Sequence, residues 1–318
     1  MPNILIVGAG AVGQAYGFHL QRGGAQVTYY VREKYRDSLV EGMSIHCLSG
    51  PQRGRHIFTE FELCSTLDEV MDQTWDQVWL CISSPALYGE WLAELVSAIG
   101  EAAIIMLQPG INDYAHVTTF VPAERVVYGM ITLASFQAPL ANDDPVAMTW
   151  WFPPLSAAPF TGKRELTMAA VKLLRRGGMR AKHVSDIIPQ LRIGSGVLMP
   201  LIAALEVAGW KLAVLRQGSY LNWAGQAARV ATQLSLPGKK RVMIWLLTQV
   251  WVLRLILRIA PIVTPFNLEA MLKSHFVKVG DQTRAMLRGY IDQAAIAEID
   301  STPIASLLNR LESLEDHR

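Results

Sequence analysis

Three glycines near the N-terminus have the spacing of a phosphate-binding turn. The motif reads Gly8-Ala9-Gly10-Ala11-Val12-Gly13. It follows a short apolar run at residues 4–7 and precedes a helix expected over residues 14–21. In such a unit the first glycine permits a tight turn, the second lets a pyrophosphate approach, and the third lets helix and strand pack closely. The free N–H groups at the start of the helix would bind the phosphates, so the sequence predicts a dinucleotide-binding turn.

The residues after the second predicted strand indicate which dinucleotide binds. This strand covers residues 25–31, and an NAD-binding chain usually has an acidic residue at its end. Arg32 stands there instead, followed by Lys34 and Arg36. A guanidinium can bind a 2′-phosphate through two hydrogen bonds, which favours NADP(H). The alternative is a solvated charged loop, because two acidic residues lie among these cations.

Composition limits the classes of function. A chain of 318 residues can form two domains with separate cores, and a formal charge of only +2 gives no nucleic-acid-binding footprint. Its three cysteines lack metal-ligand spacing, so no metal site is expected. A core strand that begins near residue 4 leaves no room for a signal peptide, and the expected location is the cytoplasm.

Strand and helix patterns alternate up to about residue 183. Further strands are expected at residues 76–82, 102–107, 126–132 and 179–184, and further helices at 87–99 and 165–175. This alternation predicts an α/β Rossmann domain, residues 1–184, with a doubly wound and mainly parallel sheet. Ligands bind beyond the carboxyl ends of such strands. The loop residues expected beside the nicotinamide are Ser83, Ser84, Gln108, Gly110 and Asn112.

From Ser185 onward, long apolar segments with helical spacing dominate, at residues 187–210, 242–259 and 268–296. They predict an all-α second domain, residues 185–318, for substrate binding and dimerisation.

The apolar segment 242–263 needs separate consideration because it is long enough to suggest a membrane span. Arg254 and Arg258 lie inside it, and each would cost about 2.5–3.5 kcal/mol near the centre of a bilayer. A membrane span is therefore not expected. A buried core or dimer helix is the favoured interpretation, ahead of a wall of an apolar substrate pocket and of contact with a membrane surface.

These motifs resemble the ketopantoate reductase (2-dehydropantoate 2-reductase) family. The resemblance rests on the glycine turn, Arg32, the loop at residues 108–112, the strand that follows it, and the helical stretch 197–201. It implies a Rossmann domain followed by a helical domain, with the active site in the cleft between them. It also implies reduction of a 2-oxo acid by NADPH, with a lysine on the first helix of the second domain as proton donor.

The catalytic positions implied by this resemblance are substituted. The lysine position falls on Leu191, the two helix asparagines on Ser195 and Met199, and the asparagine of the loop on Pro109. Leu191 can neither donate a proton nor stabilise an alkoxide, and loss of a positioned acid typically costs about 10²–10⁴-fold in rate. Efficient reduction of ketopantoate itself is therefore not expected.

Other polar residues are candidates for the chemistry: Arg192, His183, Ser195 and His275. For each of them a surface or packing role is the alternative. The function expected is an NADPH-dependent oxidoreductase that reduces a different carbonyl compound, or oxidises the matching alcohol. The rival hypothesis is a non-catalytic NADP(H)-binding or regulatory protein that kept the fold. The expected partners are a small and possibly apolar substrate and a second copy of the chain, with neither nucleic acid nor a membrane.

Overall fold

The computed structural model describes residues 1–140, 146–234 and 241–314. The chain forms two compact units, each with its own core. Unit 1 contains Met1–Pro109 and Asp113–Ile187, and unit 2 contains Gly110–Asn112 and Ile188–Arg318. The chain therefore divides after Ile187 rather than after Val184, and a short part of the loop expected beside the cofactor packs with unit 2.

Unit 1 is built on an eight-stranded sheet with the strand order β12-β11-β8-β7-β6-β1-β2-β5. Its strands are β1 (Asn3–Val7), β2 (Gln26–Tyr30), β5 (Glu62–Cys64), β6 (Gln77–Leu80), β7 (Ala103–Met106), β8 (Val126–Gly129), β11 (Ala158–Thr161) and β12 (Ala181–His183). All neighbouring pairs are parallel except β8 with β11. The predicted α/β Rossmann class is confirmed.

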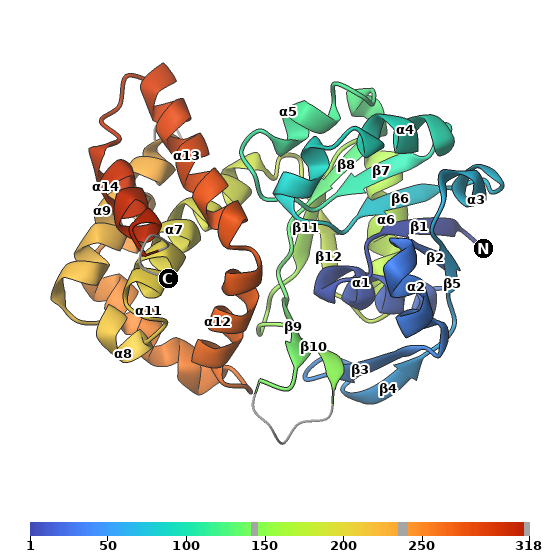
Figure 1. Ribbon diagram of the computed structural model, residues 1–318, viewed down its shortest axis with the longest axis horizontal. Coiled ribbons are helices and arrows are strands. Elements are labelled where there is room, and N and C mark those ends of the chain that lie inside the picture. Colours follow the sequence, from blue (N-terminus) through green and yellow to red (C-terminus); the bar gives the residue numbers. More distant parts are fainter. Residues whose placement is uncertain (141–145, 235–240, 315–318) are drawn as a thin grey trace. The chain divides into compact units, whose positions relative to one another are not determined.

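The helices of unit 1 connect these strands (Figure 1). They are α1 (Ala11–Arg22), α2 (Glu33–Val40), α3 (Leu67–Met71), α4 (Trp91–Ala98), α5 (Asp113–Val117) and α6 (Arg164–Arg176), with short 3-10 turns at Ser84–Tyr88 and Ala123–Arg125. Helix α1 connects β1 to β2 on one side of β1 in the sheet. Helix α4 connects β6 to β7 on the other side. Because such crossovers are right-handed, α1 and α4 cover opposite faces of the sheet.

A second sheet, which the sequence did not predict, covers α1. It has the order β4-β3-β10-β9 and is built from β3 (Met43–Cys47), β4 (Gly54–Phe58), β9 (Ala134–Ala138) and β10 (Ala147–Trp151). Phe18 of α1 packs against Phe58 and Trp150 of this sheet, with ring centroids 5.7 and 5.6 Å apart. The helix is therefore enclosed on two sides, and all its residues from Gly13 to Leu20 are buried.

Unit 2 is entirely helical in the residues described, which confirms the predicted all-α part. Its helices are α7 (Ile188–Val207), α8 (Leu212–Leu215), α9 (Gly218–Gln233), α10 (Arg241–Leu247), α11 (Val250–Val263), α12 (Leu268–Lys278), α13 (Gly280–Ile296) and α14 (Thr302–Glu312). Helix α7 packs on α9, α13 and α14, and buried residues of these four helices form the core. Among the residues described, α7 is the one helix long and apolar enough to cross a membrane, and its place in this core explains that composition.

The apolar segment 242–263 forms two helices, α10 and α11, rather than one. Leu253 and Leu257 of α11 are buried in the core of unit 2. Trp245 and Trp251, in contrast, are 53% and 58% exposed. Of the favoured interpretation, a buried core or dimer helix, the core part therefore holds for the α11 face that carries Leu253 and Leu257, whereas Trp245 of α10 and Trp251 of α11 lie outside the core.

Candidate functional site

The glycine turn of unit 1 has the geometry that its three glycines require. Gly8 has a φ of +96°, a left-handed conformation that side chains other than glycine rarely adopt. A Cβ atom on Gly13 would lie 2.0 Å from the carbonyl oxygen of Gly8, so only glycine lets α1 start this close to β1. A Cβ on Gly10 would meet nothing within 4 Å. Chain packing thus explains the first and third glycines, whereas Gly10 faces open space.

The start of α1 leaves donors for a ligand. Gly10 is the N-cap residue, and no side chain in the described residues caps the helix there. The first N–H groups of a helix have no partner within it, and they lie at the positive end of the helix dipole. The Gln14 side chain holds the turn from the other side by donating to the carbonyl of Ala9 at 2.9 Å. The turn therefore fits a pyrophosphate, as the sequence predicts.

The ends of β6 and β7 meet beside this turn. A Cβ on Gly8 would touch the carbonyl oxygen of Cys81 at 3.1 Å, which places the residue after β6 against the glycines. Gln108, which follows β7, donates through Nε2 to the carbonyls of Leu80 and Ile82 at 2.8 and 2.9 Å. Gln108 is 1% exposed, so this amide positions the strand ends and does not face solvent as a ligand contact would. Exposed Ser83 and buried Ser84 come next along the chain.

Arg32 lies close to the turn through the register of the sheet. Val7 pairs with Tyr30 in the parallel β1–β2 ladder, and the Gly8 N–H donates to the Tyr30 carbonyl at 3.0 Å. Arg32 follows two residues later as the N-cap residue of α2. Its exposed side chain makes no hydrogen bond or ion pair with the part of the chain that is described. Exposed Lys34 lies with its Nζ 5.0 Å from the ring centroid of Tyr35.

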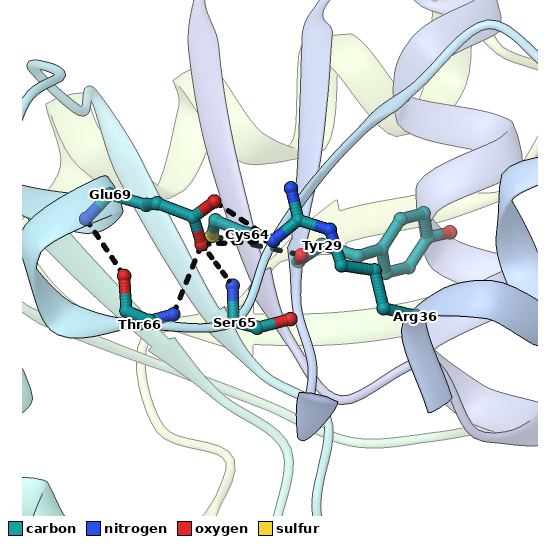
Figure 2. Close-up of polar contacts among 6 residues, drawn as sticks. All are labelled: Tyr29, Arg36, Cys64, Ser65, Thr66 and Glu69. Atoms are coloured by element: carbon teal, nitrogen blue, oxygen red, sulfur yellow. Dashed lines mark hydrogen bonds and ion pairs between the residues drawn. The ribbon is translucent and has the colours of Figure 1, made fainter. Parts of the chain in front are cut away.

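Arg36, the third cation of this group, is bound to the protein itself (Figure 2). Its Nη1 lies 2.8 Å from Oε1 of Glu69 and 3.2 Å from Oε2. The Glu69 carboxylate also accepts the backbone N–H groups of Ser65 and Thr66 at 2.6 and 3.1 Å. The Ser65 N–H, followed by Arg36, lowers the pKa of Glu69 to about 2. Arg36 therefore ties α2 to the start of α3, and Arg32 and Lys34 are the cations left for a phosphate.

Unit 2 contains a second polar group, centred on Ser195 of α7. The Tyr290 hydroxyl of α13 donates to Ser195 Oγ at 2.7 Å, and Ser195 Oγ donates to the Leu191 carbonyl at 2.8 Å. Burial raises the pKa of Tyr290 to about 12, although the Ser195 bond and nearby Arg192 oppose this. The phenol therefore keeps its proton at neutral pH, beside a hydroxyl that is only half-buried.

The loop segment Gly110–Asn112 lies near this group within unit 2. A Cβ on Gly289 would meet Cγ2 of Ile111 at 3.3 Å, and Gly289 precedes Tyr290 in α13. Asn112 is exposed, whereas Gly110 is buried. Unit 2 thus brings together Arg192, Ser195 and the loop segment, three features that the sequence analysis selected separately.

The two selected histidines lie on β12 and α12. His183 is on β12, at the edge of the large sheet, and four strands separate β12 from β1. With strands about 4.8 Å apart, roughly 24 Å lie between His183 and the strand that leads into the glycine turn. His275 of α12 contacts the ring of Phe276, and burial lowers its pKa. No interaction in the described residues links His275 to Ser195 or Arg192.

The sequence analysis missed two features of this polar group. Tyr290 carried no motif, and only its place one residue after Gly289 in an apolar helix distinguishes it. Thr283 and Arg284 of α13 are both buried, and Arg284 Nη2 pairs with Glu206 Oε1 of α7 at 3.2 Å. The ion pair joins α7 to α13 and so holds Ser195 and Tyr290 on neighbouring helices.

Comparison with known proteins agrees with this geometry. Residues 4–142 match the family model described as ketopantoate reductase PanE/ApbA. The crystal structure of a PanE/ApbA family ketopantoate reductase from Ralstonia eutropha JMP134 superposes with a TM-score of 0.76 and 14% identity, over 99% of each chain. The resemblance to the ketopantoate reductases is confirmed. Curated protein sequences give no significant match.

Other solved structures share the whole fold. The 2-dehydropantoate 2-reductase of Geobacter metallireducens GS-15 gives a TM-score of 0.67 at 16% identity, over 98% of this chain and 99% of that one. D-mandelate dehydrogenase in complex with NADH gives 0.72 at 12% identity, over 99% of both chains. At these identities the similarity establishes the fold of a ketopantoate reductase, and the chemistry depends on the residues of this chain.

Proposed function

We propose that the chain is an NADP(H)-dependent oxidoreductase that reduces a 2-oxo acid or related ketone other than ketopantoate, or oxidises the matching alcohol. The observation that carries the proposal is the start of α1, where Gly10 borders open space and no side chain in the described residues caps the helix. When bound, the reduced nicotinamide supplies a hydride. Arg32 supports the phosphorylated cofactor, because its exposed guanidinium makes no other contact in the described residues.

The proton for the reaction is assigned to Tyr290 and Ser195. As a hydride reaches the carbonyl carbon, the oxygen becomes an alkoxide and needs one proton. Ser195 would turn its O–H from the Leu191 carbonyl to that oxygen and take a proton from the Tyr290 hydroxyl in return. Arg192, on the same helix, carries a guanidinium that can pair with a substrate carboxylate. This arrangement takes over the role of the lysine that Leu191 replaces.

The substrate is proposed to be less polar than ketopantoate. Leu191 and Met199 are buried at 7% and 5% exposure, where the family resemblance implies a lysine and an asparagine. D-mandelate dehydrogenase shows that this fold also serves a 2-hydroxy acid with an aromatic ring. Benzoylformate, the 2-oxo acid that corresponds to mandelate, is therefore the first substrate to test.

The test is loss of NADPH absorbance with ketopantoate or benzoylformate at saturating concentration. Ketopantoate should turn over well below the ordinary enzyme median of about 10 s⁻¹, and the aromatic 2-oxo acid should be preferred in kcat/KM. Turnover of ketopantoate above that median would contradict the proposal. If calorimetry shows NADPH binding but no 2-oxo acid or ketone in a broad panel is reduced, the second candidate is supported, a binding protein without catalysis. The apolar Leu191 and Met199 favour that candidate.

A further inference from the structure

Helix α11 exposes a continuous apolar stripe. Trp251, Leu255, Ile259 and Ile262 are 58%, 49%, 47% and 81% exposed. Their spacing of four, four and three residues places them on one face of the helix. Leu253 and Leu257, on the opposite face, are buried in the core of unit 2. The fold of unit 2 therefore uses one face of α11 and leaves a second apolar face uncovered within the chain.

The stretch of sequence that contains this stripe is cationic. Residues 207–268 contain eight Lys and Arg residues and no Asp or Glu, in a chain with a formal net charge of +2. Arg258 is exposed beside the stripe and makes no ion pair or hydrogen bond with any residue that the structure describes. Arg254, one turn earlier, is half-buried and donates from Nε to the carbonyl of Arg216 at 3.3 Å. The free cation at the edge of the stripe is therefore Arg258.

We infer that α11 binds the surface of a lipid bilayer that contains anionic lipid. A helix with Trp, Leu and Ile on one face and arginine beside them binds in the plane of the headgroups, where the apolar face is buried and the cations meet lipid phosphates. Helix α11 has 14 residues, hence a length of about 21 Å. This is shorter than the hydrocarbon core of about 30 Å, so the helix suits the interface and not a span.

Charge complementarity favours this occupant over a second copy of the chain. In a two-fold symmetric dimer the same patch meets itself, so the cations beside α11 would face the cations of the partner. Glu269, the carboxylate that follows this stretch, already pairs with Lys211 at 3.1 Å and accepts the Leu212 N–H at 2.7 Å, so Arg258 would be buried against a like charge, which is costly. Anionic headgroups supply the missing negative charge. Membrane contact, which the sequence analysis ranked below a core or dimer helix, thus becomes the better interpretation of this face.

The experiment is co-sedimentation of the full chain with lipid vesicles. The protein should bind vesicles of phosphatidylcholine mixed with phosphatidylglycerol, and bind pure phosphatidylcholine vesicles at least about ten-fold more weakly. Arg258→Gln should weaken binding to the mixed vesicles by roughly five-fold. The double variant Leu255→Gln, Ile259→Gln should abolish it. All variants should retain their circular dichroism spectrum, because these side chains point away from the core.

Matched controls come from exposed isoleucines outside the stripe. Ile57→Gln in unit 1 and Ile296→Gln in unit 2 change side chains that are 69% and 78% exposed, and should leave vesicle binding unchanged. Equal binding to neutral and anionic vesicles would overturn the inference, as would full binding by the double variant. It would also fail if the unmodified protein did not bind vesicles. If the protein also formed a dimer that the double variant dissociates, α11 would be an interface between copies.

Discussion

At the residue scale, the proposed preference for NADPH depends on Arg32. We expect Arg32→Ala to weaken NADPH binding by about 1.5–3 kcal/mol and to leave NADH binding almost unchanged, because only NADPH has a 2′-phosphate. Calorimetric titration with both cofactors measures this. Arg53→Ala removes another exposed arginine, from the turn between β3 and β4, and is the matched control. Equal affinity of the unmodified protein for NADPH and NADH would show that Arg32 does not bind the phosphate.

At the same scale, the proposed catalysis depends on Tyr290. Tyr290→Phe keeps the buried ring and removes only the hydroxyl that donates to Ser195. We expect kcat to fall by about 10²–10⁴-fold, with little change in the affinity for NADPH. Ser195→Ala should have a similar effect, and the double variant should be hardly worse than either single one, because the two hydroxyls act as one relay. Independent, multiplying effects would argue against a relay.

At the scale of elements, two glycines of the same turn should respond in opposite ways. Gly13→Ala places a methyl group 2.0 Å from the Gly8 carbonyl oxygen, so the chain must separate α1 from β1 and lose stability. Gly10→Ala places the methyl in open space, so the free energy of unfolding should hardly change while NADPH binding weakens. Thermal unfolding and calorimetry distinguish the two variants. If Gly10→Ala binds NADPH normally, the phosphates do not lie at this turn.

The sequence predicted elements that are determined by neighbouring residues in the chain. It missed elements that depend on contacts between residues far apart in the chain. The turn before α1 follows from glycine geometry, and β1, β6 and β7 follow from short apolar runs. The sheet β4-β3-β10-β9 was missed because it joins two hairpin-like segments far apart in the chain, and short strands with mixed side chains carry little periodicity. The break between α10 and α11 was missed for a related reason. It occurs at Thr248, which is buried and bonds to the Trp245 carbonyl at 3.0 Å, and neither residue is a helix breaker.

The same contrast between local and distant contacts applies to the residues of the candidate site. Its glycines and Arg32 were selected because the roles expected of them depend on neighbours in sequence. Gln108 was selected as a loop residue beside the cofactor, whereas its amide bonds to the carbonyls of Leu80 and Ile82, a contact that depends on how two strands end side by side. Tyr290 could not be selected from the sequence, because its proposed role depends on its hydrogen bond to Ser195, which lies on a different helix. His183 was selected for its expected place at the domain junction, and His275 for its place on a helix that approaches the substrate in the family; His275 makes no contact with Ser195 or Arg192 in the described residues.

At the scale of the whole molecule, His19 makes stability depend on pH. It is 1% exposed in α1, and its Nδ1 lies 2.8 Å from the carbonyl oxygen of Gly177 after α6. Burial lowers its pKa to about 4, below the value of about 6.5 expected in the unfolded chain. The unfolded chain therefore binds the proton more tightly. The stabilisation is complete above about pH 6.5 and is lost as the pH falls through about 4.

As the pH falls from about 7 to about 5, the proton that the unfolded chain binds at His19 should lower the free energy of unfolding by about 2 kcal/mol. His19→Asn keeps a donor for the Gly177 carbonyl and does not titrate, so its unfolding should be less dependent on pH by that amount. Urea unfolding at both pH values provides the comparison. An identical pH dependence in the two proteins would show that His19 does not set this part of the profile.

The enclosure of α1 between two sheets has a consequence for the order in which the protein matures. A ribosome releases the chain from its N-terminus, so the glycine turn and α1 emerge early, together with β3 and β4. Strands β9 and β10, which complete the cover over Phe18, end only at Trp151. Until that point, Phe18 of α1, the helix that follows the glycine motif, lacks its contact with Trp150. We therefore expect the proposed dinucleotide site to be fully packed only after roughly half of the polypeptide has been synthesised.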